Sequence, residues 1–438
     1  MSDFQDIVSK ALQTATNHGA QHARVRASRS QSLDMSWRKG KIENMTSSGE
    51  SALVLQLYVD GKFGSYFTSD MRSDSIDSFI AKCIDITRLL EEDPARTLAD
   101  PELYKDRSEA DLEIFDPSVE AITPNDLIEY SKNLEALTLA HSELPILDVT
   151  IECGVTQGES CTATTNGFFG QRKTSSFGAY SSIVLTDGDK KPSDYAGSYA
   201  RYKADLRTPQ QIADEAAHFA SFKLGQKKLP TGNRTLIFDR RVASQLINKF
   251  IDPLDGWALV MKSSYFQDKI GQKFGSDLLD LHDDPLLKRC SGSRTFDSEG
   301  ITAKKATIFD KGALKQYFLD TYAANKLGLK PTTGSTSNLI LTPGTRGLDA
   351  MIADVKDGIY VTGLLGGNQD RVRGDFSHGI VGVAIENGKL TTPVSEMNIT
   401  GNHLDLWNRL SEVGNDLRTD ASTRIPSIRI DDVAVSGS

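Results

Sequence analysis

The side chains of this chain that are best suited to bind a transition metal are its histidines and cysteines, and they are widely scattered. His18 and His22 form the one pair of histidines with a metal-ligand spacing, but they flank Gly19 at the end of a surface helix. A solvated helix end explains that pair better than a metal site does. The cysteines are few for a disulfide framework and indicate buried reduced thiols, although two of them are close enough in sequence to pair: Cys83, Cys153, Cys161 and Cys290.

The segment GDFSHGIVG has the residue types of a hydrolase triad, because Asp375, Ser377 and His378 stand together in it. Neighbours in sequence cannot easily converge as nucleophile, base and orienting group, and triads are instead assembled by the fold. We therefore interpret this segment as a tight turn before a buried strand.

Two further segments suggest ligand binding by composition but lack the necessary pattern. Residues 363–375, GLLGGNQDRVRGD, are rich in glycine but have no Lys-Ser or Lys-Thr ending, so they do not match a phosphate-binding loop. Residues 278–289, LLDLHDDPLLKR, lack the alternating ligands and the distant glutamate of a calcium loop. We expect a loop between strands for the first and a solvated connection for the second.

The six residues NKFIDP, 248–253, close a segment that the sequence predicts to be helical. Its apolar residues recur at helical spacing and predict one buried face: Val242, Leu246, Ile247, Phe250 and Ile251. Pro253 cannot continue a helix without losing a backbone hydrogen bond, so the helix should end or kink near Asp252. The residues at this helix end are an amide, a lysine, an aspartate and a proline.

The whole chain has the composition of a soluble globular protein. Its 438 residues exceed the size at which single hydrophobic cores stop growing, roughly 250 to 300 residues, and predict two domains. No apolar run approaches the ~20 residues of a membrane helix, and the acidic, amphipathic start is no secretory signal, so we expect a cytoplasmic protein. A net charge of -9, without any run of basic residues, disfavours direct nucleic-acid binding.

Helices and hairpins come in blocks along the chain. Amphipathic helices are predicted over 4–18 and 74–90, and Thr-Pro pairs predict two more, over 124–140 and 209–227. Alternating strands surround four turn dipeptides at 39–40, 60–61, 311–312 and 387–388. This order predicts an α+β fold with helices packed on largely antiparallel sheets rich in β-hairpins.

The expected domain boundary lies at the segment KLPTGN, residues 228–233. Residues 1–230 should form an N-terminal α+β domain, within which residues 91–117 form a surface excursion. Residues 231–438 should form a C-terminal domain of mostly antiparallel β structure, which carries the helix that ends in NKFIDP.

Several long segments resemble the TldD/TldE (PmbA) family, which was once labelled modulator of DNA gyrase and is grouped with zinc metallopeptidases. Four of them lie in the last two-thirds of the chain, in the family's order: TTNGFFGQRKTSSFGAYSSIVLTDGDKKPSDYA, GALKQYFLDTYAANKLGLKPTTG, the stretch from DGIYVTGLLGG to NRLSEVGND, and the ending PSIRIDDVAVSGS. The TldD-like branch carries a His-Glu-x-x-x-His helix, in which the imidazoles hold zinc and the glutamate activates water, and a further cysteine ligand near the C-terminus.

The resemblance places Asn248 at the first histidine, Lys249 at the glutamate and Pro253 at the second histidine of that helix. No cysteine follows Cys290. The resemblance therefore implies a degenerate zinc site with no metal, no cofactor and no catalytic residue.

The function implied by the resemblance is that of a non-catalytic TldE/PmbA-like subunit. It would partner a TldD-like zinc metallopeptidase in the cleavage of unfolded peptides. Two alternatives stay open: a metallopeptidase or other peptidase that is active in its own right, and a regulator of DNA gyrase that acts through protein contacts. The sequence leaves open whether the chain also forms a homodimer.

Overall fold

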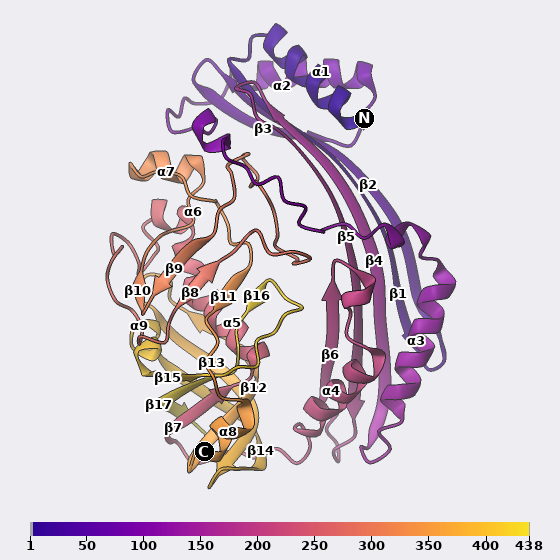
Figure 1. Ribbon diagram of the computed structural model, residues 1–438, viewed down its shortest axis with the longest axis vertical. Helices are drawn as coiled ribbons and strands as arrows, with labels where there is room; N and C mark the ends of the chain where they lie inside the picture. The colour runs from indigo at the N-terminus through magenta and orange to yellow at the C-terminus, as the bar shows by residue number, and fades with distance from the viewer. Residues whose placement is uncertain (1–2, 438) are drawn as a thin grey trace.

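The first part of the chain is built on one long, curved antiparallel sheet of six strands. The computed structural model describes residues 3–437. Figure 1 shows this sheet as a continuous layer beside the second part of the molecule. Its strands lie in the order β3-β2-β1-β4-β5-β6. They are β1 (His22–Arg38), β2 (Lys41–Val59), β3 (Lys62–Thr68), β4 (Ile146–Thr164), β5 (Phe169–Leu185) and β6 (Ser193–Ala200).

Two pairs of helices cover the two ends of this sheet. The helices are α1 (Asp3–Asn17), α2 (Ser73–Thr87), α3 (Pro124–Leu139) and α4 (Pro209–Ser221). The first pair packs on β1 to β4, and the second pair packs on β4 to β6 and on the end of β1, each around its own apolar core. The middle of the long strands is partly exposed.

All four helices of the first part were predicted, and their ends follow local chemistry. Thr123 and Thr208 form capping boxes in front of the prolines that begin α3 and α4. Gly19 follows α1 with a φ of 98°, as expected of a glycine that ends a helix. Helix α4 ends at Ser221, earlier than the predicted end at residue 227.

The second part contains two mixed sheets. A six-stranded sheet has the order β14-β13-β12-β7-β17-β15, and a five-stranded sheet has the order β10-β9-β8-β11-β16. The first contains β7 (Gly232–Phe238), β12 (Asp357–Gln369), β13 (Asp375–Glu386), β14 (Lys389–Asn402), β15 (Leu410–Val413) and β17 (Ile428–Ser436). The second contains β8 (Leu281–Asp283), β9 (Ala306–Asp310), β10 (Ala313–Leu314), β11 (Leu339–Leu341) and β16 (Thr423–Arg424).

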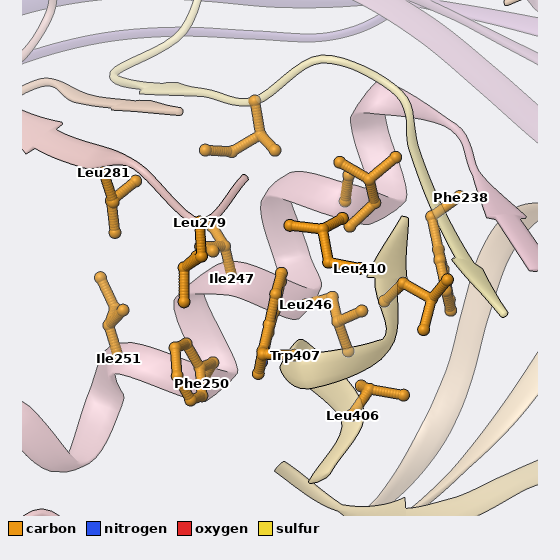
Figure 2. Close-up of a cluster of buried hydrophobic side chains, with 14 of the residues drawn as sticks. Phe238, Leu246, Ile247, Phe250, Ile251, Leu279, Leu281, Leu406, Trp407 and Leu410 are labelled. Atoms are coloured by element: carbon orange, nitrogen blue, oxygen red, sulfur yellow. The ribbon is translucent and has the colours of Figure 1, made fainter. Parts of the chain in front are cut away.

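Helix α5 (Arg240–Ile251) lies in the core of this second part. Figure 2 shows its Leu246, Ile247 and Phe250 among other buried apolar side chains, near Trp407 and Leu279. Shorter helices complete the part: α6 (Gly256–Val260), α7 (Thr321–Leu327), α8 (Leu348–Ala353) and α9 (His403–Leu406). The predicted α+β fold is confirmed, because helices pack on sheets that are mostly antiparallel.

The four predicted hairpin turns are all present. Each turn has a non-glycine residue followed by a glycine, and both have positive φ: Lys39 and Gly40, Asp60 and Gly61, Lys311 and Gly312, Asn387 and Gly388. This is the conformation that a type I′ turn requires. The four cysteines are free and buried, as predicted.

Several local expectations need correction. A turn precedes β13 as expected, but β12 extends to Gln369 and β13 begins at Asp375, so the expected loop is confined to residues 370–374 and the candidate triad lies on the strand itself. In the segment 278–289, Asp283 belongs to β8 and is buried, where its carboxylate accepts hydrogen bonds from the backbone and hydroxyl of Ser337. A partner 54 residues away therefore makes this a structured segment.

The segment 91–117 is not an excursion confined to the first part. Lys326 pairs with Asp93 at 2.9 Å, and the backbone N–H of Arg289 donates to the carbonyl of Leu112 at 2.8 Å. The segment thus connects the two parts. Among residues 3–437, no helix is long and apolar enough to cross a membrane.

Candidate site at the end of helix α5

Helix α5 is held at its beginning by a buried cap. Asp239 accepts the backbone N–H of Arg241 through Oδ1, at 2.8 Å, and the hydroxyl of Tyr360 through Oδ2, at 2.6 Å. A carboxylate at a helix start satisfies free N–H groups and is favoured by the helix dipole. The cap therefore fixes α5 against β12, the strand that carries Tyr360.

The other end of α5 terminates where the sequence predicted. The helix ends at Ile251, and a 3-10 turn from Asp252 to Leu254 follows it. Arg371 pairs with Asp252 at 2.6 Å, and Gln369 donates to the backbone carbonyl of Lys249 at 2.7 Å. The last residue of β12 and the segment that follows it therefore hold this helix end in place.

The three positions that the resemblance singled out lie in different surroundings. Asn248 is exposed, and its Oδ1 accepts a 3.2 Å hydrogen bond from the hydroxyl of Thr423. Lys249 is half-buried. Pro253 is buried in the 3-10 turn, outside α5, and its carbonyl accepts a 2.6 Å hydrogen bond from Ser264. Their side chains thus form no common set of ligands, because one is amide, one is ammonium and one is an aliphatic ring.

Two buried histidines near Lys249 were not identified as site residues from the sequence. His378 on β13 and His403 on α9 are fully buried, and the ring of Phe376 lies 5.4 Å and 4.8 Å from theirs. None of the four imidazole nitrogens has a hydrogen-bond partner of good geometry, although His378 contacts the backbone of Gly366. Alternation along β13 could have predicted one of them, because His378 shares a strand face with Phe376.

The surroundings of these histidines favour their neutral forms. Burial, assisted by the charges of His378 and Lys249, lowers the pKa of His403 to about 3. Burial and then Lys249 also lower the pKa of His378. Removal of a charged imidazole from water is costly, and a nearby ammonium adds to that cost. Two neutral imidazoles thus lie in the apolar core, close to the half-buried Lys249.

A triad at Asp375, Ser377 and His378 is also inconsistent with the geometry. All three residues lie on β13, where the side chains of Ser377 and His378 point to opposite faces. Ser377 is exposed and His378 is buried. Among the residues that the structure describes, no group of three or more His, Cys, Asp or Glu side chains is arranged to hold a metal ion.

Comparison with known families assigns this fold to a metallopeptidase-related class. Three family models match in chain order: PmbA/TldA metallopeptidase domain 1 at residues 23–87, the central domain at 117–223 and the C-terminal domain at 231–437. The chain belongs to the PmbA/TldD family.

Individual relatives match along almost the entire chain. The metalloprotease PmbA of Escherichia coli O157:H7 is 27% identical over 99% of this chain and 96% of its own length. A solved structure from Bacteroides thetaiotaomicron, named modulator of DNA gyrase, is 38% identical with a TM-score of 0.96, and each chain covers 100% of the other. TldE from Thermococcus kodakarensis shares the fold, with a TM-score of 0.87 at 18% identity over 98% of this chain and 100% of that one.

Proposed function

We propose that this chain is a non-catalytic TldE/PmbA-like subunit that assembles with a TldD-like zinc metallopeptidase and supports its cleavage of unfolded peptides. The proposal rests on the end of α5, where the resemblance assigns Asn248, Lys249 and Pro253 to the positions of two zinc ligands and a base, and where these side chains form no set of metal ligands. The oxygen of Asn248 is engaged by Thr423, and Pro253 has no ligand atom.

The chemistry of zinc hydrolysis explains why these residue types do not support it. A catalytic zinc needs three protein ligands and an open position, and a carboxylate then removes a proton from the bound water. The ammonium of Lys249 would repel a cation and can accept no proton. The two nearby histidines, His378 and His403, offer nitrogen lone pairs, but both are buried in the core.

We propose further that the chain acts in the cytoplasm, and that residues 1–230 and 231–438 form its two domains. In this proposal, the degenerate positions are Asn248, Lys249 and Pro253, and the chain binds no metal or cofactor of its own. The chain could also form a homodimer before it assembles with the partner, and the oligomeric state of the purified chain tests this.

The first alternative is a peptidase that is active in its own right, and the name metalloprotease of the Escherichia coli relative favours it. The second is a gyrase regulator that acts through protein contacts, which the name of the Bacteroides protein favours. The first alternative predicts that the isolated chain cleaves peptides, and the second predicts that the isolated chain acts on gyrase. The proposed non-catalytic subunit would do neither.

A mixing experiment tests the proposal. This chain and a TldD-like subunit from the same cell are purified separately and incubated with an unstructured peptide, alone and together, with and without a chelator. We expect chelator-sensitive cleavage that this chain enhances, with zinc present only in the partner by elemental analysis. A partner whose motif glutamate is replaced by glutamine is the matched control, and the mixture that contains it should be inactive. Chelator-sensitive cleavage by this chain alone would overturn the proposal.

A further inference from the structure

A polar cavity of about 470 Å³ lies where the long sheet meets the second part of the chain. One side is formed by the partly exposed middle of strands β1, β2, β4 and β5, which Figure 1 shows facing the second part. The other side is formed by residues 291–294. The cavity is separate from the end of α5, and none of its lining residues belongs to the site described above.

Arginine is the dominant charged residue of this cavity. Five arginines line it, against two glutamates: Arg26, Arg29, Arg172, Arg201 and Arg294, with Glu50 and Glu159. Arg29 pairs with Glu159 at 3.6 Å. The other four arginines form no ion pair with any residue that the structure describes. Four guanidinium groups of the cavity therefore have no directly paired carboxylate among the described residues, in a chain whose net charge is -9.

Backbone carbonyls hold three of these guanidinium groups in place without neutralising them. Arg172 donates to the carbonyl of Phe296 at 2.8 Å, and Arg201 donates to those of Ser175 at 2.9 Å and Ser291 at 2.6 Å. Arg294 donates to the carbonyl of Ser335 at 2.6 Å. An arginine side chain that becomes ordered on binding a ligand loses conformational entropy. Because these three side chains are already held in place, they would bind a ligand at a lower entropic cost.

Arg172 lies close enough to the other three arginines to be repelled by them. Burial, together with the charges of Arg26, Arg294 and Arg201, lowers the pKa of Arg172 to about 10. The buried carboxylates Asp283 and Asp297 offset part of this positive charge, but neither forms an ion pair with an arginine among the described residues. Like charges gathered in a partly buried space are unfavourable unless an opposite charge joins them.

Hydrogen-bond donors in the cavity are also left over. Among the described residues, none is hydrogen-bonded to the exposed side chain of Arg26, and the buried Nε groups of Arg201 and Arg294 have no acceptor. Serine and threonine hydroxyls from the strands add further donors around them. The guanidinium of Arg26 and these hydroxyls can therefore donate to a ligand that is rich in acceptors.

We propose that this cavity binds an oxyanion that carries two or more negative charges, presented either as a free polycarboxylate or phosphate or as the side chains of an acidic peptide segment. Planar guanidinium groups match the two oxygens of a carboxylate or a phosphate, and several of them around one space select for multiple charge. This inference does not depend on the proposed function.

Titration calorimetry on the full chain tests the proposal with two probes, citrate and a hexaglutamate peptide. Arg26→Gln is the informative variant, because Arg26 holds no other group in place. Arg373→Gln is the matched control, since Arg373 is also exposed, forms no ion pair with a described residue and lies outside the cavity. We expect saturable binding that weakens by about fivefold or more in Arg26→Gln, is unchanged in Arg373→Gln, and weakens as salt screens the charges.

The two probes also distinguish the source of the anion. Tighter binding of the peptide than of citrate would identify an acidic segment, and the reverse would identify a free anion. Thermal melting checks that each variant is folded, and Arg172→Met gives a second variant inside the cavity. No saturable binding of either probe, or an equal loss in Arg26→Gln and Arg373→Gln, would overturn the proposal.

Discussion

The hydroxyl of Tyr360 donates a 2.6 Å hydrogen bond to Asp239, the residue that caps helix α5. Both side chains are buried. Burial raises the pKa of Tyr360, and the neighbouring carboxylate of Asp239 raises it further, so the hydroxyl keeps its proton. The carboxylate of Asp239 thus binds both the start of α5 and strand β12 of the six-stranded sheet in the second part. It therefore fixes the position of α5, including Lys249, against that sheet.

Replacement of Asp239 should cost more stability than replacement of its partner. Asp239→Ala removes the cap and leaves the Tyr360 hydroxyl buried without an acceptor, so we expect a loss of about 3 kcal/mol in the free energy of unfolding. Tyr360→Phe removes one hydrogen bond to a charged group and should cost about 1.5 kcal/mol. Urea denaturation of both single variants and the double variant measures this. A double variant whose loss equals the sum of the single losses would contradict the coupling.

The buried histidine on α9 should make the protein less stable in mild acid. The unfolded chain takes up a proton at His403 near pH 6.5, whereas the folded chain does so only near pH 3. The unfolded state therefore binds more protons between these values, and stability falls as the pH falls through this window by about 1.4 kcal/mol per pH unit for this group. His378, whose pKa burial also lowers, should add to the slope.

Denaturation midpoints between pH 7.5 and pH 5 test this expectation, because most carboxylates stay ionised in that range. His403→Leu should flatten the pH dependence, since the leucine has no proton to gain. His22→Gln is the control, because His22 is exposed and its replacement should leave the slope as it is in the wild type. An equal slope in the wild type and His403→Leu would show that His403 does not govern the acid response.

The parts of the fold that the sequence predicted are those determined by neighbouring residues. Capping by Thr123 and Thr208, and the positive φ of the turn at Lys39 and Gly40, need only a few adjacent residues. The environment of Asp283 could not be predicted in the same way, because its burial depends on Ser337. Local patterns say little about polar residues whose partners are distant in sequence.

The same distinction applies to the two sites. The resemblance identified Asn248, Lys249 and Pro253, but not that one is exposed and another buried, because that depends on packing after the helix ends. The arginine cavity is formed by strands and a loop that extend from residue 26 to residue 294. It leaves no basic run in the sequence, so only the fold reveals it.

A comparison of two hairpin glycines separates backbone strain from steric crowding. Gly388 and Gly40 have similar φ values of 78° and 73°. A Cβ added at Gly388 would lie 2.4 Å from the carbonyl oxygen of Ala353, whereas a Cβ added at Gly40 would have no heavy atom beyond its chain neighbours within 4 Å. Gly40→Ala should cost about 1 kcal/mol through strain alone, and Gly388→Ala about 2 kcal/mol or more. Thermal and urea unfolding measure both. Equal losses would show that the end of α8 at Ala353 moves aside without a cost in free energy.

Restoration of the ligand residues on α5 should not create a peptidase. In the triple variant Asn248→His, Lys249→Glu and Pro253→His, the last change places an imidazole at a buried position outside the helix, and no cysteine follows Cys290 to complete the site. We therefore expect at most weak zinc binding by elemental analysis and negligible cleavage of an unstructured peptide. Lys249→Glu alone is the control for the charge change, and it should be inactive because a base without a metal has no polarised water to deprotonate. Stoichiometric zinc together with chelator-sensitive cleavage by a correctly folded triple variant would mean that these three positions are all that separates this chain from an active enzyme.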